Sequence, residues 1–192
     1  MKRIVNIFIV ALIALGTSSC GYNSMVEKQE GVVKTWANVE TQYQRRADLI
    51  PNLVNTVKGF AEHEKSTLTA VVEARAKATS VNIDPSKMTA ADMQNFNAAQ
   101  GGLGSALSKL MVVVEKYPDL KANENFLQLQ AQLEGTENRI SVARKNYNDV
   151  VGDYNTYIKR FPKNIIAGWF DFEPKPYFES KKGADVAPEV QF

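Results

Sequence analysis

The stretch from Phe126 to Phe161 constrains the fold of this chain more than any other. Reading it in steps of three and four residues meets an apolar or aromatic side chain at almost every step, and no proline interrupts it before Pro162. Such a seam is typical of a helix that packs against other helices along its whole length. At about 1.5 Å per residue, the predicted helix is roughly 50 Å long.

Three earlier segments show the same three-four steps and predict helices that end near Arg46, Thr79 and Tyr117. We interpret Asp48 as the N-cap of the second helix, with Pro51 in its first turn; a single helix kinked at Pro51 is the alternative. Four helices with short connections predict an all-α fold, an antiparallel up-down-up-down four-helix bundle with long helices and an irregular C-terminal tail. The predicted organisation is an anchor segment over 1–20, the bundle over 21–163 and an aromatic tail over 164–192.

The N-terminus resembles an export signal. A basic start, Lys2-Arg3, precedes an apolar run from Ile4 to Leu15 and the only cysteine of the chain, Cys20. The apolar run is too short to span about 30 Å of hydrocarbon, but it suits a signal peptide. We therefore predict lipid attachment at Cys20, although Thr17 stands where such signals usually have Leu. The alternatives are an uncleaved single-pass anchor and plain secretion with a free cysteine.

Charge and cysteine content exclude other classes. The chain has 23 Lys and Arg against 21 Asp and Glu, and Lys2 and Arg3 account for the difference. A neutral body argues against a nucleic-acid partner, which requires a basic face. A single cysteine excludes a disulfide within the chain.

The positive-inside rule places the tethered body outside the cytoplasm, on the periplasmic side or at the cell surface.

Long sequence motifs lie at 22–26, 44–54, 57–64, 117–123, 133–140 and 154–155. In these motifs the chain resembles the LemA family, and the resemblance extends from about Tyr22 to Phe192. It implies a four-helix bundle anchored at its N-terminus in a bacterial membrane, with an uncharacterised biochemical function. It supplies no catalytic residue.

Candidate chemistry is sparse, so no catalytic, metal-binding or cofactor-binding residue is predicted, and we expect no enzyme activity. His63 is the only histidine and lies between Glu62 and Glu64, but neighbouring residues of a helix point about 100° apart and cannot converge on one ion. A solvated polar face is the simpler interpretation.

Arg45, Arg46 and Asp48 suit either a docking patch or an ion-pair network at the helix junction, and we favour the network.

Polar residues also interrupt the apolar seams. Thr136, Gln100 and Gln29 suit either the setting of helix register or the lining of a ligand pocket, and register is the simpler interpretation. The glycines Gly101, Gly102 and Gly104 predict a kink, a mobile point or, most simply, close packing against a neighbouring helix.

The aromatic tail is the most suggestive candidate for a contact surface. In the predicted topology, Trp169, Phe170 and Phe172 emerge at the same end as the anchor, so they are candidates for contact with the membrane or a partner. Folding back onto the bundle is the alternative.

The predicted function is a membrane-tethered, non-enzymatic scaffold or adaptor that binds other envelope proteins or lipid. A ligand-binding or sensing protein with a polar pocket inside the bundle is the alternative.

Overall fold

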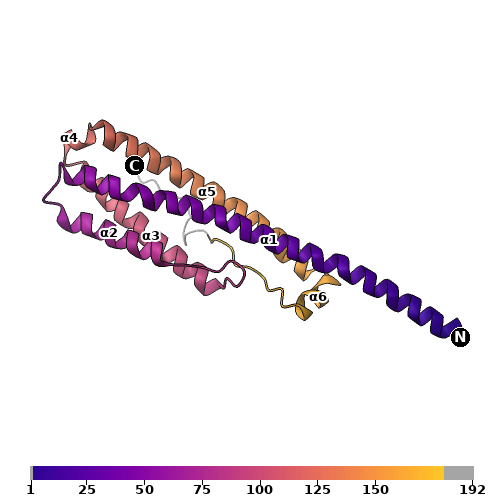
Figure 1. Ribbon diagram of the computed structural model, residues 1–192. Helices are drawn as coiled ribbons and strands as arrows, with labels where there is room; N and C mark the ends of the chain where they lie inside the picture. The colour runs from indigo at the N-terminus through magenta and orange to yellow at the C-terminus, as the bar shows by residue number, and fades with distance from the viewer. Residues whose placement is uncertain (1, 180–192) are drawn as a thin grey trace, which may run out of the picture.

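The computed structural model describes the backbone of residues 2–179 and the side chains of residues 21–179, and over this range the fold is all-α, as predicted. The six helices are α1 (Lys2–Lys58), α2 (Lys65–Ser80), α3 (Ala90–Val114), α4 (Pro118–Lys121), α5 (Glu124–Lys159) and α6 (Lys163–Trp169) (Figure 1). Within residues 21–179, whose side chains are described, no helical segment combines the length and the apolar character needed to cross a membrane.

Helix α1 is longer than predicted, because it continues through Pro51 to Lys58. The predicted boundary at Asp48 is therefore wrong, and the helix is continuous through Pro51, as in the alternative of a single helix kinked at Pro51. Proline has no N–H, so the carbonyl of Ala47, four residues earlier, loses its helical partner. Arg75 on α2 donates from Nε to that oxygen at 2.8 Å. A side chain from a neighbouring helix thus makes the proline tolerable.

The start of α3 follows the sequence signal closely. Thr89 accepts a hydrogen bond from the backbone N–H of Asp92, and the Asp92 carboxylate accepts one from the backbone N–H of Thr89. This reciprocal pair is the predicted capping box. Asn123 caps α5 in a similar way by accepting from the N–H of Phe126 at 3.1 Å.

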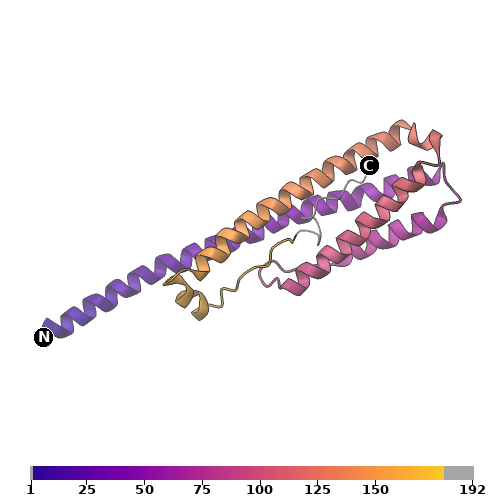
Figure 2. The ribbon, with the colours of Figure 1, turned by 180° about the vertical axis from the view of Figure 1, so that it is seen from behind.

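The C-terminal segment departs from the prediction of an irregular tail, because its first part forms the short helix α6. After α6 the chain is extended and runs back along α5 (Figure 2). Asn155 on α5 bonds to both the N–H and the carbonyl of Lys175 at 2.8 Å, and Asn148 bonds in the same manner to Phe178. The apolar seam of α5 ends with the buried Ile158. The predicted end at Phe161 is wrong, because Phe161 is 81% exposed.

The long helices lie side by side, but not every neighbouring pair is in contact. Helix α1 packs along α5, and α2 packs against both α1 and α3, whereas α3 and α5 make hardly any close backbone approach (Figures 1 and 2). The N-terminal part of α1 extends beyond the other helices, at the end where α6 lies. Among the described residues, the separation of α3 from α5 leaves one side of the assembly open.

The buried apolar side chains form two clusters along the long axis. One cluster surrounds Trp36, whose ring packs against Phe96, Tyr147 and Phe178 with centroids 5.1–5.8 Å away. The other includes Ile50, Leu103 and Leu133. Buried polar side chains lie between the two clusters, and they form the candidate site.

Candidate functional site

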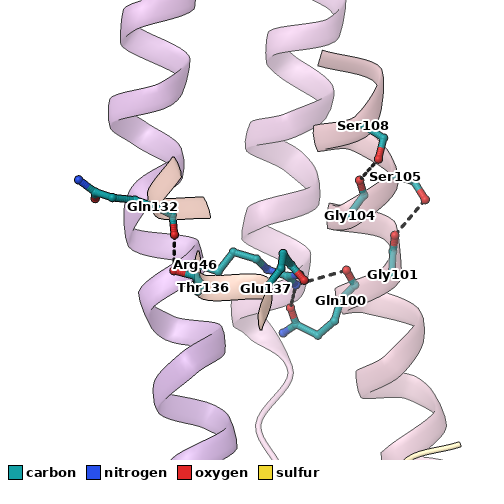
Figure 3. A network of polar contacts seen from close by, with 9 residues as sticks. All are labelled: Arg46, Gln100, Gly101, Gly104, Ser105, Ser108, Gln132, Thr136 and Glu137. Atoms are coloured by element: carbon teal, nitrogen blue, oxygen red, sulfur yellow. Dashed lines mark hydrogen bonds and ion pairs between the residues drawn. The ribbon is translucent and has the colours of Figure 1, made fainter. Parts of the chain in front are cut away.

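A polar layer connects the four long helices at the boundary between the two apolar clusters. Arg46 of α1 donates from Nη1 to Glu137 Oε1 on α5 and from Nη2 to Gln100 Oε1 on α3, each at 2.6 Å (Figure 3). Gln100 Nε2 donates to the carbonyl of Ala78 on α2 at 3.2 Å. Ala78 lies in the last turn of α2, where carbonyls lack helical partners, so Gln100 also caps that helix.

The two members of the ion pair have different exposure. The Arg46 side chain is 5% exposed and that of Glu137 is 52% exposed. Arg46 also lies over the Tyr43 ring at 5.1 Å, a favourable cation–π geometry. Burial raises the pKa of the Tyr43 hydroxyl, and Arg144 and Arg46 partly oppose that rise. The Nε of Arg46 is buried and has no hydrogen-bond partner among the described residues.

An open groove of about 990 Å³ lies beside this layer, between α3 and α5. Arg46 and Gln100 reach it from the core, and Glu134 and Glu137 reach it from α5. Apolar side chains supply much of the rest of its surface, chiefly Met93, Leu107, Met111, Leu133 and Ile140. Pro176, Tyr177 and Glu179 of the extended tail form one end. The groove therefore combines an apolar surface with one buried charge.

The α3 side of the groove carries small residues: Gly101, Gly104, Ser105 and Ser108. A Cβ added at Gly101, Gly102 or Gly104 would meet nothing within 4 Å, so the prediction of close helix packing at these glycines is wrong. Ser105 and Ser108 donate to the carbonyls of Gly101 and Gly104 at 3.0 Å (Figure 3). The serine hydroxyls are thus bonded to carbonyls of their own helix. The small side chains on this side of the groove project little into it.

The structure separates the polar residues that the sequence grouped together. Gln100 lines the groove, but Gln29 does not, and Thr136 is fully buried with its hydroxyl donating to the Gln132 carbonyl at 2.7 Å. A pocket shared by Gln29, Gln100 and Thr136 does not form. Register and helix packing remain the roles that fit Thr136.

The three residues near the predicted helix junction have different environments. Arg46 takes part in an ion-pair network, as the favoured interpretation states, but Arg45 is exposed. Asp48 is exposed too, and it accepts from Gln44 Nε2 at 2.7 Å instead of capping a helix. The network therefore binds α1 to α5 and α3.

His63 lies in the turn between α1 and α2, exposed to solvent. Of its two acidic neighbours, Glu62 is exposed and Glu64 accepts a hydrogen bond from the Tyr117 hydroxyl at 3.2 Å. Within residues that the structure describes, no group of three or more His, Cys, Asp and Glu residues is placed to hold a metal ion.

The candidate contact residues of the tail behave differently from one another. Trp169 is 75% exposed and Phe170 is 56% exposed. Phe172 is half-buried, and its ring lies 5.7 Å from that of Tyr22. The side chain of Cys20, the predicted lipid-attachment residue, lies outside the described residues.

Sequence reasoning missed two groups of residues. Glu137 was not recognised as the partner of Arg46, because a helix ending near Arg46 could not be aligned with α5. Asn148 and Asn155, which hold the extended tail, were also missed. Their spacing of seven residues on one face of a long helix was the signal that could have identified them.

The fold and the groove define the class: an all-α protein of long helices with a polar layer through its core and an open groove beside it. The chain belongs to the LemA family, whose family model matches residues 35–192. This confirms the resemblance seen in the sequence.

Relatives include magnetosome proteins. The chain is 28% identical over 195 residues to magnetosome protein MamQ 2 of Paramagnetospirillum magneticum, covering 93% of this chain and 71% of the relative. It is 25% identical to magnetosome protein MamQ of Magnetospirillum gryphiswaldense, with 96% and 75% covered. It is 22% identical to protein LemA of Metamycoplasma hominis, with 83% and 69% covered.

Proposed function

We propose that this protein is a membrane-tethered, non-enzymatic adaptor of the bacterial envelope, and that its α3–α5 groove receives a helical segment of another envelope protein. The observation that carries the proposal is the open, elongated groove between two long helices. The tether rests on the signal-like N-terminus and on what family membership implies. The body then lies outside the cytoplasm, on the side opposite the basic N-terminus.

The dimensions of the groove favour a helix over a compact small molecule. Its lining residues extend from Gln130 to Arg144 on α5 and from Ala90 to Met111 on α3. At 1.5 Å per residue these spans correspond to about 21 Å and about 32 Å. A helix of about 14 residues has the shorter of these lengths. A partner helix would pair with the sides of α3 and α5 that lack a neighbour among the described residues.

The composition of the groove also suits a helix. Amphipathic helices bind in grooves through apolar side chains at every third or fourth position, and Leu107, Met111 and Leu133 offer the complementary surface. Glycine and serine on α3 permit a close approach of helix backbones. The buried Nε of Arg46 has no hydrogen-bond partner among the described residues, so it would favour an acceptor group at the middle of the partner segment.

A second candidate is a ligand-binding protein whose ligand is a small anion or polar molecule at Arg46 and Gln100. The observation in its favour is the unpaired Nε of Arg46. The other two nitrogens of that guanidinium are already engaged by Glu137 and Gln100, which leaves little charge for an anion. The elongated apolar surface would also remain unexplained.

The test uses a photocrosslinking amino acid at Ser105, inside the groove, in the full chain in intact cells. We expect a discrete crosslinked protein that is not obtained from Lys109, an exposed residue of α3 outside the groove. A Gly101→Leu substitution fills the groove and should abolish the product. Gly102→Leu is the matched control, because Gly102 is equally exposed and equally open but does not line the groove.

The helix itself should tolerate both leucines, since each replaces a helical glycine and gains roughly 0.5–1 kcal/mol of helix propensity. Capture of the same protein from Ser105 and Lys109, or equal capture in the two leucine variants, would contradict the groove as the binding site. Capture of no protein from any position would contradict the adaptor function.

A further inference from the structure

We infer that α6 and its flanks form a membrane-contacting foot, which rests on an anionic lipid surface and fixes the orientation of the bundle. The foot consists of Lys159, Arg160, Phe161, Ile165, Trp169 and Phe170. The inference rests on the proposed tether but not on the groove. Its occupant is the bilayer surface beside the anchor.

The first support is the exposure of large apolar side chains in one short segment. Phe161, Trp169 and Phe170 are more than half exposed, and Ile165 is 45% exposed. By contrast, Tyr147 and Tyr154 on α5 are fully buried and Tyr157 is half-buried. Exposed apolar residues grouped in this way mark surfaces that contact a partner or a membrane.

The second support is the position of α6 against α1. The Tyr22 ring lies 4.8 Å from that of Phe170, and a Cβ added at Gly21 would lie 3.3 Å from Ile166 Cδ1. Gly21 immediately follows Cys20, the predicted site of lipid attachment. If the apolar run ending at Leu15 is retained instead, Gly21 lies about 9 Å further along the helix. A lipid on Cys20 would place α6 within the layer of lipid headgroups, a zone of about 5–8 Å on each side of the hydrocarbon, and the retained anchor would place Gly21 at about the outer limit of that layer.

The third support is the chemistry of the segment. Lys159 and Arg160 are exposed, and Lys163 packs its Nζ 3.5 Å from the centre of the Tyr157 ring. Asp171 is the only acidic residue between positions 159 and 171. Basic residues are attracted to anionic headgroups, and tryptophan prefers the interface between water and hydrocarbon. A protein partner would not require this combination to lie beside the anchor.

Tryptophan fluorescence offers a direct test, since the chain has two tryptophans and the other, Trp36, is fully buried in the bundle. The full-length protein is reconstituted into vesicles of phosphatidylcholine and phosphatidylglycerol, with and without bromine on the acyl chains near the headgroup. Flotation first shows that the protein is bound. Brominated lipid should then quench a component that disappears in Trp169→Phe.

The matched control moves the reporter without changing the tether. In Trp169→Phe/Val142→Trp the new tryptophan replaces another exposed residue of the described region, about 25 Å along α5 from Lys159. It should be quenched by aqueous acrylamide and not by brominated lipid. Lys159→Glu/Arg160→Glu should lower the equilibrium constant for the lipid-bound orientation on anionic vesicles by more than about 25-fold, since each of the two basic residues contributes about fivefold. The change is measured as a loss of Trp169 quenching by brominated lipid.

The outcomes separate the tether from the foot. A protein that floats, but whose Trp169 is quenched by acrylamide and not by brominated lipid, retains its tether and lacks the foot. A protein that does not float overturns both. Quenching of Trp169 that is equal on neutral and anionic vesicles would overturn the requirement for anionic lipid.

Discussion

The ion pair between Arg46 and Glu137 predicts an asymmetric response to mutation. Removing Glu137 leaves the Arg46 guanidinium without a counter-charge, and that side chain is only 5% exposed. Removing Arg46 leaves Glu137, which is 52% exposed and can be solvated by water. The more exposed residue should therefore be the more costly one to lose.

The magnitudes follow from the two environments. Breaking a buried ion pair by removing one partner costs about 3–5 kcal/mol, and the open groove places Glu137→Ala at the low end, about 3 kcal/mol. In Arg46→Met, the new side chain fills the apolar volume, and the main loss is the unsatisfied Gln100 amide oxygen, about 1–2 kcal/mol. The double variant should resemble Arg46→Met alone, because Glu137 then has no buried charge to neutralise.

The free energies of unfolding are measured by urea titration of the full chain, monitored by circular dichroism of the helices. For a chain of this size, about 3 kcal/mol corresponds to a decrease in Tm of roughly 6–12 °C. Lys145→Ala is the control, since its ion pair with Asp149 is exposed on both sides and should contribute less than about 0.5 kcal/mol. If Arg46→Met costs clearly more than Glu137→Ala, the reasoning about burial is refuted.

Two further predictions concern the contacts between α5 and the extended tail. Burial, assisted by Glu173, raises the pKa of Tyr154 to about 12, so the neutral phenol stabilises the fold below pH about 10 and this contribution is lost as the pH rises towards 12. Unfolding at pH 8–11.5 should therefore show a steeper alkaline loss of stability in the wild type than in Tyr154→Phe; equal slopes would contradict the assignment. Asn155→Leu removes two hydrogen bonds to Lys175 and should cost about 2 kcal/mol, with faster amide exchange confined to the tail and not spread over α5.

The sequence by itself determined the all-α class, the family and the main helical seam. The three-four steps from Phe126 onward require a long packed helix, and the capping box at Thr89 defines the start of α3 by local hydrogen bonds alone. Both signals depend on residues close together in the chain. For the same reason, no local rule could show that α1 passes through Pro51, because the compensating donor is Arg75 on another helix.

Only the tertiary structure decided the candidate site. The candidate site is formed by three helices, which supply Arg46, Gln100 and Glu137. These side chains meet only if the helices have the right relative register. An error in the predicted end of α1 changes that register. The open glycine side of α3 is a further example, because the same glycines suit close packing or a groove, and only the position of α5 decides between them. The long seam remains the basis of the fold, and among the described residues the groove between α3 and α5 is where the proposed partner would bind.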